Sequence, residues 1–520
     1  MKYLLALDAG TGSFRSVVFD TEGHQIAISQ AEWTHIEEDG VSNSMSFDFE
    51  HNYSIVCRCI KESISNANID ADDILALSAT SMREGIVLYD KNGDELWAVA
   101  NVDARAGDEV KYLKENYSDL EEEFYSISGQ TFALGALPRI LWLKNNRKDI
   151  YDRVAKVSMI GDWLLAKLSG VIVSDPSNAG TTGVFSLEKR EWACEMASKI
   201  GVKDDIFGDV LEVGEVVGSV TPKASKQTGL SCDTLVVMGG GDVQLGSAGL
   251  GVVDEGDVAI LGGSFWQQVV NIKSSQKPPK DMALRVNPHV IDGLSQAEGI
   301  TFFSGLVMRW FRDAFCDMEK LEAKERGVDV YQLLEEKASK VPVGSYGILP
   351  IFSDIMRYGK WYHCAPSFLN LSLDESRCNR VSMFRSLEEN AAIVSSINLE
   401  NIKRFSGVEF DEIVFAGGAS KGKLWSQIVA DVTGYKVKIP KITEATALGA
   451  AMAAGVGCGV YKDLKSASKK LVEWDKTYYP NLENKKIYDE IKIKWQKAYK
   501  VQLALVDDGI TESMWMAPGI

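Results

Sequence analysis

Short apolar runs alternate with polar, glycine-containing loops along the first part of the chain. Apolar or β-branched stretches predict strands at residues 4–7, 16–19, 25–30 and 74–78. A longer pattern over about 48–66 predicts a helix, and helical patterns follow near 106–123 and 137–146. The first two strands flank the loop Asp8-Ala9-Gly10-Thr11-Gly12-Ser13, so the chain begins as strand, glycine loop, strand.

The same unit recurs near the middle of the chain. The strand predicted at 234–238 leads into Gly239-Gly240-Gly241-Asp242, the densest glycine run. Apolar residues 258–261 then precede the loop Gly262-Gly263-Ser264 and a strand at 267–272. Gly262 follows Gly10 by 252 residues (262 − 10), close to half of the 520-residue chain. This spacing favours two halves, residues 1–247 and 248–520, with their boundary near Leu245–Val253.

Alternating strands and helices continue through the second half. Phe384, Leu387, Ala391 and Val394 recur at helical spacing. A strand is predicted at 412–415, followed by the loop Ala416-Gly417-Gly418-Ala419-Ser420 and a helix that ends at Gly434. Residues 446–455 form a helix of small side chains that permits a close backbone approach. The alternation predicts an α/β fold.

Composition and charge argue against nucleic acid as a partner and against a membrane or secreted location. The net charge is −17, which argues against a nucleic-acid binder, because such a protein needs a basic face. No apolar run is long enough to span a membrane, and the first residues do not resemble a signal peptide. The eight cysteines are scattered without zinc spacing, which favours reduced thiols in a cytoplasmic protein. A homodimer is left open.

Two glycine-rich loops are candidates for binding a phosphate. In the first, backbone amides, the hydroxyls of Thr11 and Ser13, and Arg15 suit an anion, while Asp8 suits a hydrated metal ion. A tight turn with surface polar groups explains this loop equally well. Residues 417–424 nearly match the Walker A pattern, but Leu424 stands where a hydroxyl residue must bind magnesium. A glycine loop that lets a ligand approach the following helix is the better interpretation.

Two acidic positions have competing interpretations. Asp242 follows a strand and three glycines, where it is either a general base or a helix N-cap. Arg83 and Glu84 are adjacent, and by themselves predict a surface salt bridge. The five histidines form no pattern typical of a metal site.

Taken together and in order, these motifs resemble the FGGY carbohydrate kinases. Residues 8–15 resemble the first phosphate loop of that family, 261–264 the second, and 416–420 the adenosine loop. Glu444-Ala445-Thr446-Ala447-Leu448-Gly449-Ala450-Ala451 resembles its C-terminal helix. The resemblance implies two actin-like, ribonuclease-H-type domains with ATP and a sugar between them. It also implies Mg²⁺ beside Asp8.

The resemblance also implies residue roles. Asp242 matches the catalytic base, and Arg83 and Glu84 match a pair that binds polyol hydroxyls. The matched loops imply nucleotide contacts at Gly10, Thr11, Gly12, Ser13, Arg15, Gly262, Gly263, Ser264, Gly417, Gly418 and Ala419. Residues 81–85, 101–105, 175–183, 239–246 and 265–268 resemble the branch that phosphorylates the terminal hydroxyl of autoinducer-2, the linear signal 4,5-dihydroxy-2,3-pentanedione. Trp266 is expected among its substrate contacts.

Two positions depart from the family pattern. Glycerol kinases have Gln after the base, where this chain has Val243, and the second phosphate loop usually has Thr where this chain has Gly263. The first departure affects the polyol contact and the second affects phosphate binding. The competing functions are a kinase of another short polyol or ketose, such as glycerol, erythritol or xylulose, and an actin-like ATPase.

Overall fold

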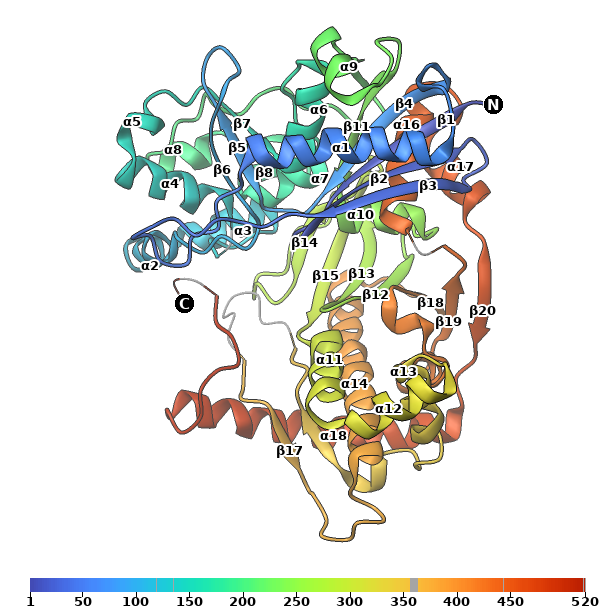
Figure 1. Cartoon of the computed structure of the whole chain (residues 1–520). Helices are drawn as coiled ribbons and strands as arrows, with labels where there is room; N and C mark the ends of the chain where they lie inside the picture. The colour runs from blue at the N-terminus through green and yellow to red at the C-terminus, as the bar shows by residue number, and fades with distance from the viewer. Residues whose placement is uncertain (118, 134, 356–362, 443, 518, 520) are drawn as a thin grey trace.

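The computed structural model describes residues 1–117, 119–133, 135–355, 363–442, 444–517 and 519. Two large mixed sheets form the centres of an upper and a lower lobe (Figure 1). Helices pack against both, so the α/β fold expected from the sequence is confirmed.

The sheet of the upper lobe is built mainly from the first third of the chain. Its strand order is β10 (Val216–Ser219), β11 (Leu235–Gly241), β4 (Ile74–Ser81), β1 (Tyr3–Ala9), β2 (Ser13–Asp20) and β3 (Gln25–Glu32). The pairs of β1 with β4 and of β4 with β11 are parallel, whereas β1, β2 and β3 form an antiparallel meander. The carboxyl ends of three parallel strands therefore lie side by side, at Ala9, Ser81 and Gly241.

The sheet of the lower lobe repeats this plan. Its order is β14 (Arg285–Pro288), β15 (Leu294–Thr301), β13 (Trp266–Lys273), β12 (Val258–Gly262), β18 (Glu412–Ala416), β19 (Lys436–Pro440) and β20 (Trp474–Tyr478). Here β12 and β13 form the antiparallel hairpin, and β12 pairs with β18 in parallel. The second strand, loop, strand unit of the sequence thus occupies the position that β1 and β2 occupy in the first sheet.

Smaller sheets and the remaining elements complete the lobes. The smaller sheets pair β6 (Glu95–Val99), β5 (Ile86–Tyr89) and β7 (Lys156–Met159), β8 (Phe185–Ser186) with β9 (Glu191–Trp192), and β16 (Leu349–Ile351) with β17 (Ser367–Leu369). The helices of the first half are α1 (Phe49–Ala67), α2 (Gly107–Asn116), α3 (Leu120–Ser128), α4 (Ala136–Asn146), α5 (Lys148–Tyr151), α6 (Ile160–Ser169), α7 (Pro176–Ala179), α8 (Glu195–Lys199), α9 (Pro222–Thr228) and α10 (Asp242–Gly249). Those of the second half are α11 (Ser304–Phe315), α12 (Asp317–Arg326), α13 (Val330–Ala338), α14 (Arg380–Ser406), α15 (Lys423–Thr433), α16 (Ala445–Gly457), α17 (Leu464–Leu471) and α18 (Leu482–Asp507). Short 3₁₀ turns lie at η1 (Ala71–Asp73), η2 (Gly180–Thr182), η3 (Ser345–Gly347) and η4 (Gly418–Lys421).

The sequence-based elements are found with two differences. The single helical pattern near 106–123 is divided between α2 and α3. The glycine run 239–241 belongs to the end of β11 and is not a loop. A Cβ at Gly239 would lie 1.7 Å from the carbonyl oxygen of Ala79 on β4, so only glycine allows the two strands to approach this closely.

Two helices cross between the lobes. α10 follows β11 and directs Val243 and Leu250 toward the second sheet, while α16, from the second half, packs its small side chains on the first sheet. A Cβ at Gly449 would lie 2.1 Å from the carbonyl oxygen of Leu245, and one at Gly249 would lie 1.9 Å from that of Ala445. The helices therefore touch backbone to backbone. The expected division at 247/248 falls within α10 and stays a prediction.

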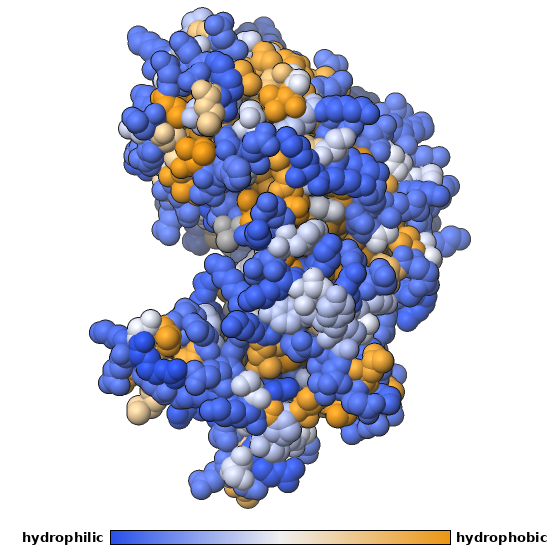
Figure 2. All heavy atoms as spheres, turned by 90° about the vertical axis from the view of Figure 1, so that its right-hand side faces the viewer, coloured by the Kyte–Doolittle hydropathy of each residue, from blue (hydrophilic) through white to orange (hydrophobic). Residues whose placement is uncertain are grey.

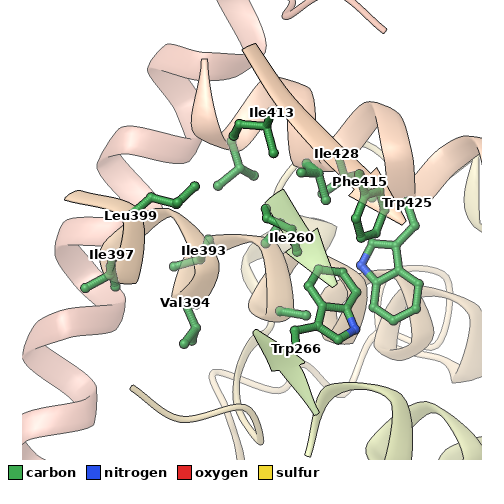
Figure 3. Packing of buried hydrophobic residues seen from close by; sticks show 14 of the residues in the cluster. Ile260, Trp266, Ile393, Val394, Ile397, Leu399, Ile413, Phe415, Trp425 and Ile428 are labelled. Carbon is green, nitrogen blue, oxygen red and sulfur yellow. The ribbon is translucent and has the colours of Figure 1, made fainter. Parts of the chain in front are cut away.

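The lower lobe has an extensive apolar core between its sheet and helices. Ile260 and Phe415 from the sheet pack against α14 and α15, as Figure 3 shows. The surface, in contrast, is mainly hydrophilic with scattered hydrophobic groups on the face shown in Figure 2. None of the described helices is both long and apolar enough to cross a membrane.

Candidate active site

A cavity of about 760 Å³ lies where residues of both halves converge. Thr11, Arg83, Glu84 and Asp242 line it from the first half, and Ser264 lines it from the second. Five of the residues expected at the site are therefore brought to one space, although up to 253 residues (264 − 11) separate them in the chain.

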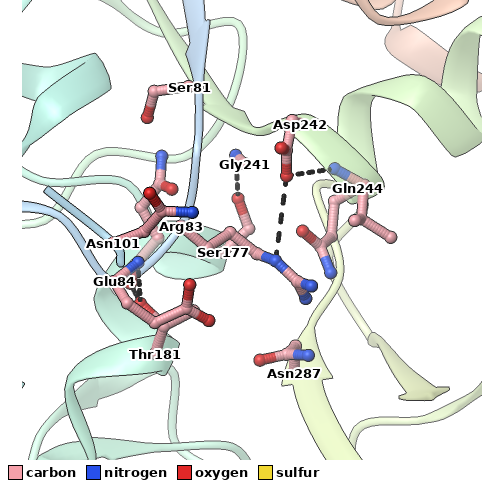
Figure 4. Close-up of polar contacts among 12 residues, drawn as sticks. Ser81, Arg83, Glu84, Asn101, Ser177, Thr181, Gly241, Asp242, Gln244 and Asn287 are labelled. Atoms are coloured by element: carbon pink, nitrogen blue, oxygen red, sulfur yellow. Dashed lines mark hydrogen bonds and ion pairs between the residues drawn. The ribbon is translucent and has the colours of Figure 1, made fainter. Parts of the chain in front are cut away.

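Asp242 is the first residue of α10 and directly follows strand β11. Its carboxylate accepts a hydrogen bond from the backbone N–H of Val243 at 2.8 Å and lies 3.7 Å from Nε of Arg83 (Figure 4). The side chain keeps 38% of its surface exposed. Desolvation in the cleft raises the pKa of Asp242 to about 6, against the opposing charge of Arg83. The carboxylate is therefore largely ionised at neutral pH, as a general base must be.

The turn that carries Asp242 is held by a buried polar chain. Ser177 Oγ accepts a hydrogen bond from the backbone N–H of Gly241 at 2.8 Å (Figure 4) and donates to the Asp175 carboxylate. Asp175 also caps the start of α7 by accepting from the N–H groups of Ser177 and Asn178. Because these groups are buried and hydrogen-bonded, they fix the backbone just before the candidate base.

Arg83 and Glu84 do not form the surface salt bridge that adjacency suggests. Arg83 is bound at two points by Glu298 of β15, with distances of 2.7 Å from Nη1 and 3.0 Å from Nη2. Glu84 forms an ion pair with Arg285 of β14. Burial alone would lower the pKa of Arg83, but Glu298 raises it overall, and Arg83 in turn lowers the pKa of Glu298. Two crossed ion pairs therefore join the first half to the second.

Glu84 adopts a left-handed backbone conformation with φ of 65°. Arg139, which is buried, supports this turn by donating to the carbonyl oxygens of Glu84 at 2.6 Å and of Asn101 and Asp103 at 2.7 Å. The pKa of Arg139 is lowered by burial. A guanidinium that binds three carbonyl groups fixes two loops of the cavity wall relative to each other.

The first glycine loop lies at the end of β1. Asp8 is opposite Arg15 in the β1–β2 register, and Arg15 lies 3.5 Å from Asp8 and 3.2 Å from Glu444, which precedes α16. Burial raises the pKa of Asp8 to about 7; Arg15 opposes this rise, whereas the charges of Asp242 and Glu444 add to it. Trp33 Nε1 donates to the carbonyl of Gly10, and Asn101 donates to Thr11 Oγ1. Gly12 and Ser13 complete the loop and the start of β2.

The second and third glycine loops contact each other. Gly417 has φ of 94°, and a Cβ there would lie 2.8 Å from the carbonyl oxygen of Gly262. A Cβ at Gly262 would likewise be too close to the Cβ of Ala419. In contrast, a Cβ at Gly418 or at Gly12 would meet no protein atom within 4 Å. The backbone at these two glycines is therefore open to an approaching ligand. Gly417, Gly418 and Ala419 do not line the cavity described above.

The second loop is fixed against α11. A Cβ at Gly305 would lie 2.2 Å from the carbonyl oxygen of Gly263, and the N–H of Gly305 donates to the carbonyl of Ser264 at 3.0 Å. A Cβ at Gly263 would meet only the carbonyl oxygen of Phe265, at an ordinary 3.4 Å. The departure to glycine at 263 is thus not forced by packing. Val243, the other departure, packs in a cluster with Leu250 and Val269.

The expectation for Trp266 needs correction. Its side chain is fully buried, with ring centroids 4.7 Å from Trp425 and 5.1 Å from Phe415 (Figure 3). It is part of the core of the lower lobe because side chains alternate across strand β13. Its neighbour Phe265 faces the cavity instead. Phe265, and not Trp266, is therefore the aromatic residue of this pair that lines the cavity.

Several cavity residues were not expected from the sequence. Gln130, Thr131, Thr181, Phe302, Phe303, Arg285 and Trp515 also line the cavity. A signal existed for Glu298, the partner of Arg83, because a carboxylate within the otherwise uncharged strand 294–301 requires a buried cation. The aromatic residues carry no such signal.

The site provides carboxylates for a divalent cation but no closed metal cage. Among the described residues, no group of three or more His, Cys, Asp or Glu side chains is arranged to hold a metal ion. Burial and the charge of Asp242 raise the pKa of Asp8, and a cation bound beside Asp8 would lower it. This donor set fits Mg²⁺, which binds to one or two carboxylates together with waters and substrate phosphates.

Known proteins share the whole architecture. The chain is similar in fold to the xylulose kinase of Lactobacillus acidophilus, with a TM-score of 0.84 and 18% identity over 97% of this chain and 99% of that one. It is similar to the Plasmodium falciparum glycerol kinase solved with ADP, with a TM-score of 0.81 and 18% identity over 97% and 98%. These likenesses confirm the expected two-domain kinase fold.

Relatives with higher identity match along the whole chain. The chain is 56% identical to an autoinducer-2 kinase of Enterobacter sp. (strain 638) and 55% identical to one of Salmonella typhimurium, over 100% of this chain and 98% of each relative. Residues 3–249 match the model of the N-terminal domain of the FGGY family of carbohydrate kinases, and residues 269–458 match that of its C-terminal domain. The chain therefore belongs to the FGGY family of carbohydrate kinases.

Proposed function

We propose that this protein transfers the γ-phosphoryl group of ATP to the terminal hydroxyl of autoinducer-2, giving phospho-autoinducer-2 and ADP. The substrate assignment is supported by full-length relatives, named autoinducer-2 kinases, at 55–56% identity. The observation that carries the reaction type is the position of Asp242: an ionisable carboxylate opens into a cavity that both halves of the chain line.

In the proposed reaction, Asp242 accepts the proton of the attacking primary hydroxyl. Its pKa of about 6 keeps it ionised at neutral pH yet basic enough to take up a proton as the oxygen–phosphorus bond forms. Arg83 lies beside Asp242 and is itself held by Glu298, so the base is kept in one orientation. No covalent enzyme intermediate is required, because phosphoryl transfer depends mainly on positioning and charge stabilisation.

The glycine loops are proposed to bind the nucleotide. The hydroxyls of Thr11 and Ser264 line the cavity from opposite halves, and open space beside Gly12 and Gly418 lets a phosphate approach backbone N–H groups. Asp8 would hold Mg²⁺ together with waters and the ATP phosphates, whose charge the ion would neutralise. The aromatic residues Phe265 and Phe302 would exclude water from the acceptor.

Mass spectrometry of the product tests this proposal. The purified protein is incubated with ATP, Mg²⁺ and dihydroxy-pentanedione, and we expect a product heavier by one phosphoryl group together with stoichiometric ADP. Glycerol, erythritol and xylulose serve as competing acceptors. Faster turnover of one of these would reassign the substrate, whereas ATP hydrolysis that no acceptor stimulates would favour an ATPase.

A further inference from the structure

The arginines of the two ion pairs at the cavity differ in how many of their nitrogen atoms already contact protein groups. Arg83 directs both terminal nitrogens at Glu298 and its Nε toward Asp242. Its side chain is only 6% exposed. Arg83 therefore has little capacity left for a small substrate, although the sequence suggested that role.

Arg285 has a different environment. It lies on β14 directly opposite Glu298 in the β14–β15 register, but its guanidinium turns to Glu84 and the cavity. Its Nε donates to Gln130 Oε1 at 2.9 Å and its Nη2 pairs with Glu84. Nη1 of Arg285 has no hydrogen-bond partner among the residues that the structure describes.

The orientation of Arg285 is fixed from two sides. Gln130 Nε2 donates to the carbonyl of Val286 at 2.9 Å and to Asn287 Oδ1 at 3.0 Å, which leaves its oxygen directed at Arg285. Glu84 is held in its left-handed turn by Arg139. A guanidinium held in this way loses little freedom when a ligand binds, which favours affinity.

The chemistry of Arg285 favours a particular ligand group. A guanidinium donates hydrogen bonds and never accepts them. Gln130 Oε1 accepts from Nε of Arg285, and the Glu84 carboxylate forms an ion pair with it. A ligand hydroxyl beside Arg285 would need a second partner for its own proton, whereas a carbonyl oxygen needs only the donor. We propose that Arg285 is a specificity-determining residue that donates to a carbonyl oxygen of the acceptor, selecting a ketone over the corresponding polyol.

This inference rests on the proposed kinase function and specifies its substrate class as a short ketone-bearing alcohol. It is tested with Arg285→Gln and two acceptors: dihydroxy-pentanedione, and the tetrol obtained by reducing both of its carbonyl groups. We expect the KM of the variant for the diketone to rise about 10- to 100-fold, as for loss of a hydrogen bond to a charged group. The KM for the tetrol should change by less than about threefold, and the KM for ATP should not change.

Two further variants separate recognition from structure. Arg190→Gln removes another arginine whose side chain is also 8% exposed and ion-paired, but which does not line the cavity. It should leave both acceptor KM values unchanged. Arg285→Lys keeps the charge beside Glu84 but loses the planar fork, so its diketone KM should lie between those of wild type and Arg285→Gln.

Equal changes for diketone and tetrol, or no change for either, would overturn the assignment of Arg285. Failure of the proposed function is recognised separately, because the wild-type protein would then not turn over the diketone. In that case xylulose and its reduced alditol replace the two acceptors, and the same difference in KM is expected if Arg285 recognises a carbonyl.

Discussion

Asp242 is proposed to accept the proton of the attacking hydroxyl, so its substitution is the most direct test at the scale of single residues. We expect Asp242→Asn to abolish phosphoryl transfer while leaving ATP binding near normal, because an amide of the same size cannot accept the proton. Calorimetric titration with ATP and product analysis by mass spectrometry measure the two effects. Transfer close to the wild-type rate would contradict the assignment.

The pKa of Asp242 adds a pH dependence. A base must be ionised, and burial raises the pKa of this carboxyl to about 6. We therefore expect kcat to fall as the pH drops below about 6, by about tenfold per pH unit. Initial rates between pH 5 and 8 at saturating substrates, with protein stability recorded in parallel, check this. A rate that stays constant down to pH 5 would exclude Asp242 as the titrating base.

Arg83→Ala and Glu84→Ala should both raise the KM for the acceptor more than the KM for ATP, Arg83→Ala because it releases Asp242 and Glu298 from their partner, but the stability of the two variants should differ. Arg83→Ala leaves Glu298, which is fully buried, without its cation, at a cost of about 3–5 kcal/mol. Glu84 is more exposed than Arg83, and its loss removes only the ion-pair partner of Arg285 at the cavity. Thermal melting and steady-state kinetics compare the variants. A selective loss of ATP affinity would place the pair outside the acceptor site.

Some residues of the candidate site could be predicted from the sequence, and others could not. The motif residues Thr11, Asp242 and Ser264 could be predicted, because glycine loops and strand ends mark such sites in the sequence. Trp266 was misplaced because the pattern does not say which of two adjacent aromatic residues faces the cavity. The partners of Arg83 and Glu84 could not be found, since they lie about 200 residues further along the chain and meet them only through the pairing of the lobes.

At the scale of elements, the glycine loops and the crossing helices use glycine for different reasons. Gly418 is surrounded by open space, so a methyl group added there meets no protein atom within 4 Å. We expect Gly418→Ala to leave the melting temperature nearly unchanged but to raise the KM for ATP severalfold. Kinetics with ATP varied at fixed acceptor measure this effect. An unchanged KM for ATP would remove this loop from the nucleotide site.

Gly449 has the opposite environment, because a Cβ there would lie 2.1 Å from the carbonyl oxygen of Leu245. We expect Gly449→Ala to separate α10 from α16 and to destabilise the protein by about 1–3 kcal/mol, the usual cost of overpacking. Gly208→Ala is the matched control, because its nearest atom would be 4.0 Å away. Denaturant unfolding compares them. Equal stability of the two variants would mean that the helices can move apart at no cost.

The strands and helices themselves could largely be predicted from periodicity, whereas their partners could not. The small residues of α16 indicated a close backbone approach, but they did not indicate which element the helix approaches. In the structure the helix lies on the first sheet, against strands from the other half of the chain. The packing of a helix from one half on the sheet of the other depends on the whole chain, which a local sequence pattern does not encode.

At the scale of the whole molecule, we expect ATP and the acceptor together to close the two lobes. Thr11 and Ser264 already line one cavity, whereas Gly417 and Gly418 lie outside it. On the acceptor side, the Arg83–Glu298 and Glu84–Arg285 ion pairs join the two halves of the chain. Movement is therefore expected on the nucleotide side, with α10 and α16 as the pivot. In-line transfer requires the hydroxyl within about 3–3.5 Å of phosphorus, so the loops of both lobes must converge.

Small-angle scattering of Asp242→Asn measures this closure, because the variant should bind ATP and acceptor without consuming them. We expect a smaller radius of gyration with both ligands than with either alone, since each ligand contacts mainly one side of the cleft. Hydrogen exchange should slow in the loops at 10–13 and 417–420 but change little in the core of β12 and β18. Domain closure of this kind excludes water, which would otherwise compete with the acceptor for the phosphoryl group. An unchanged radius, together with unchanged exchange in both loops, would show that the lobes are already in their catalytic arrangement.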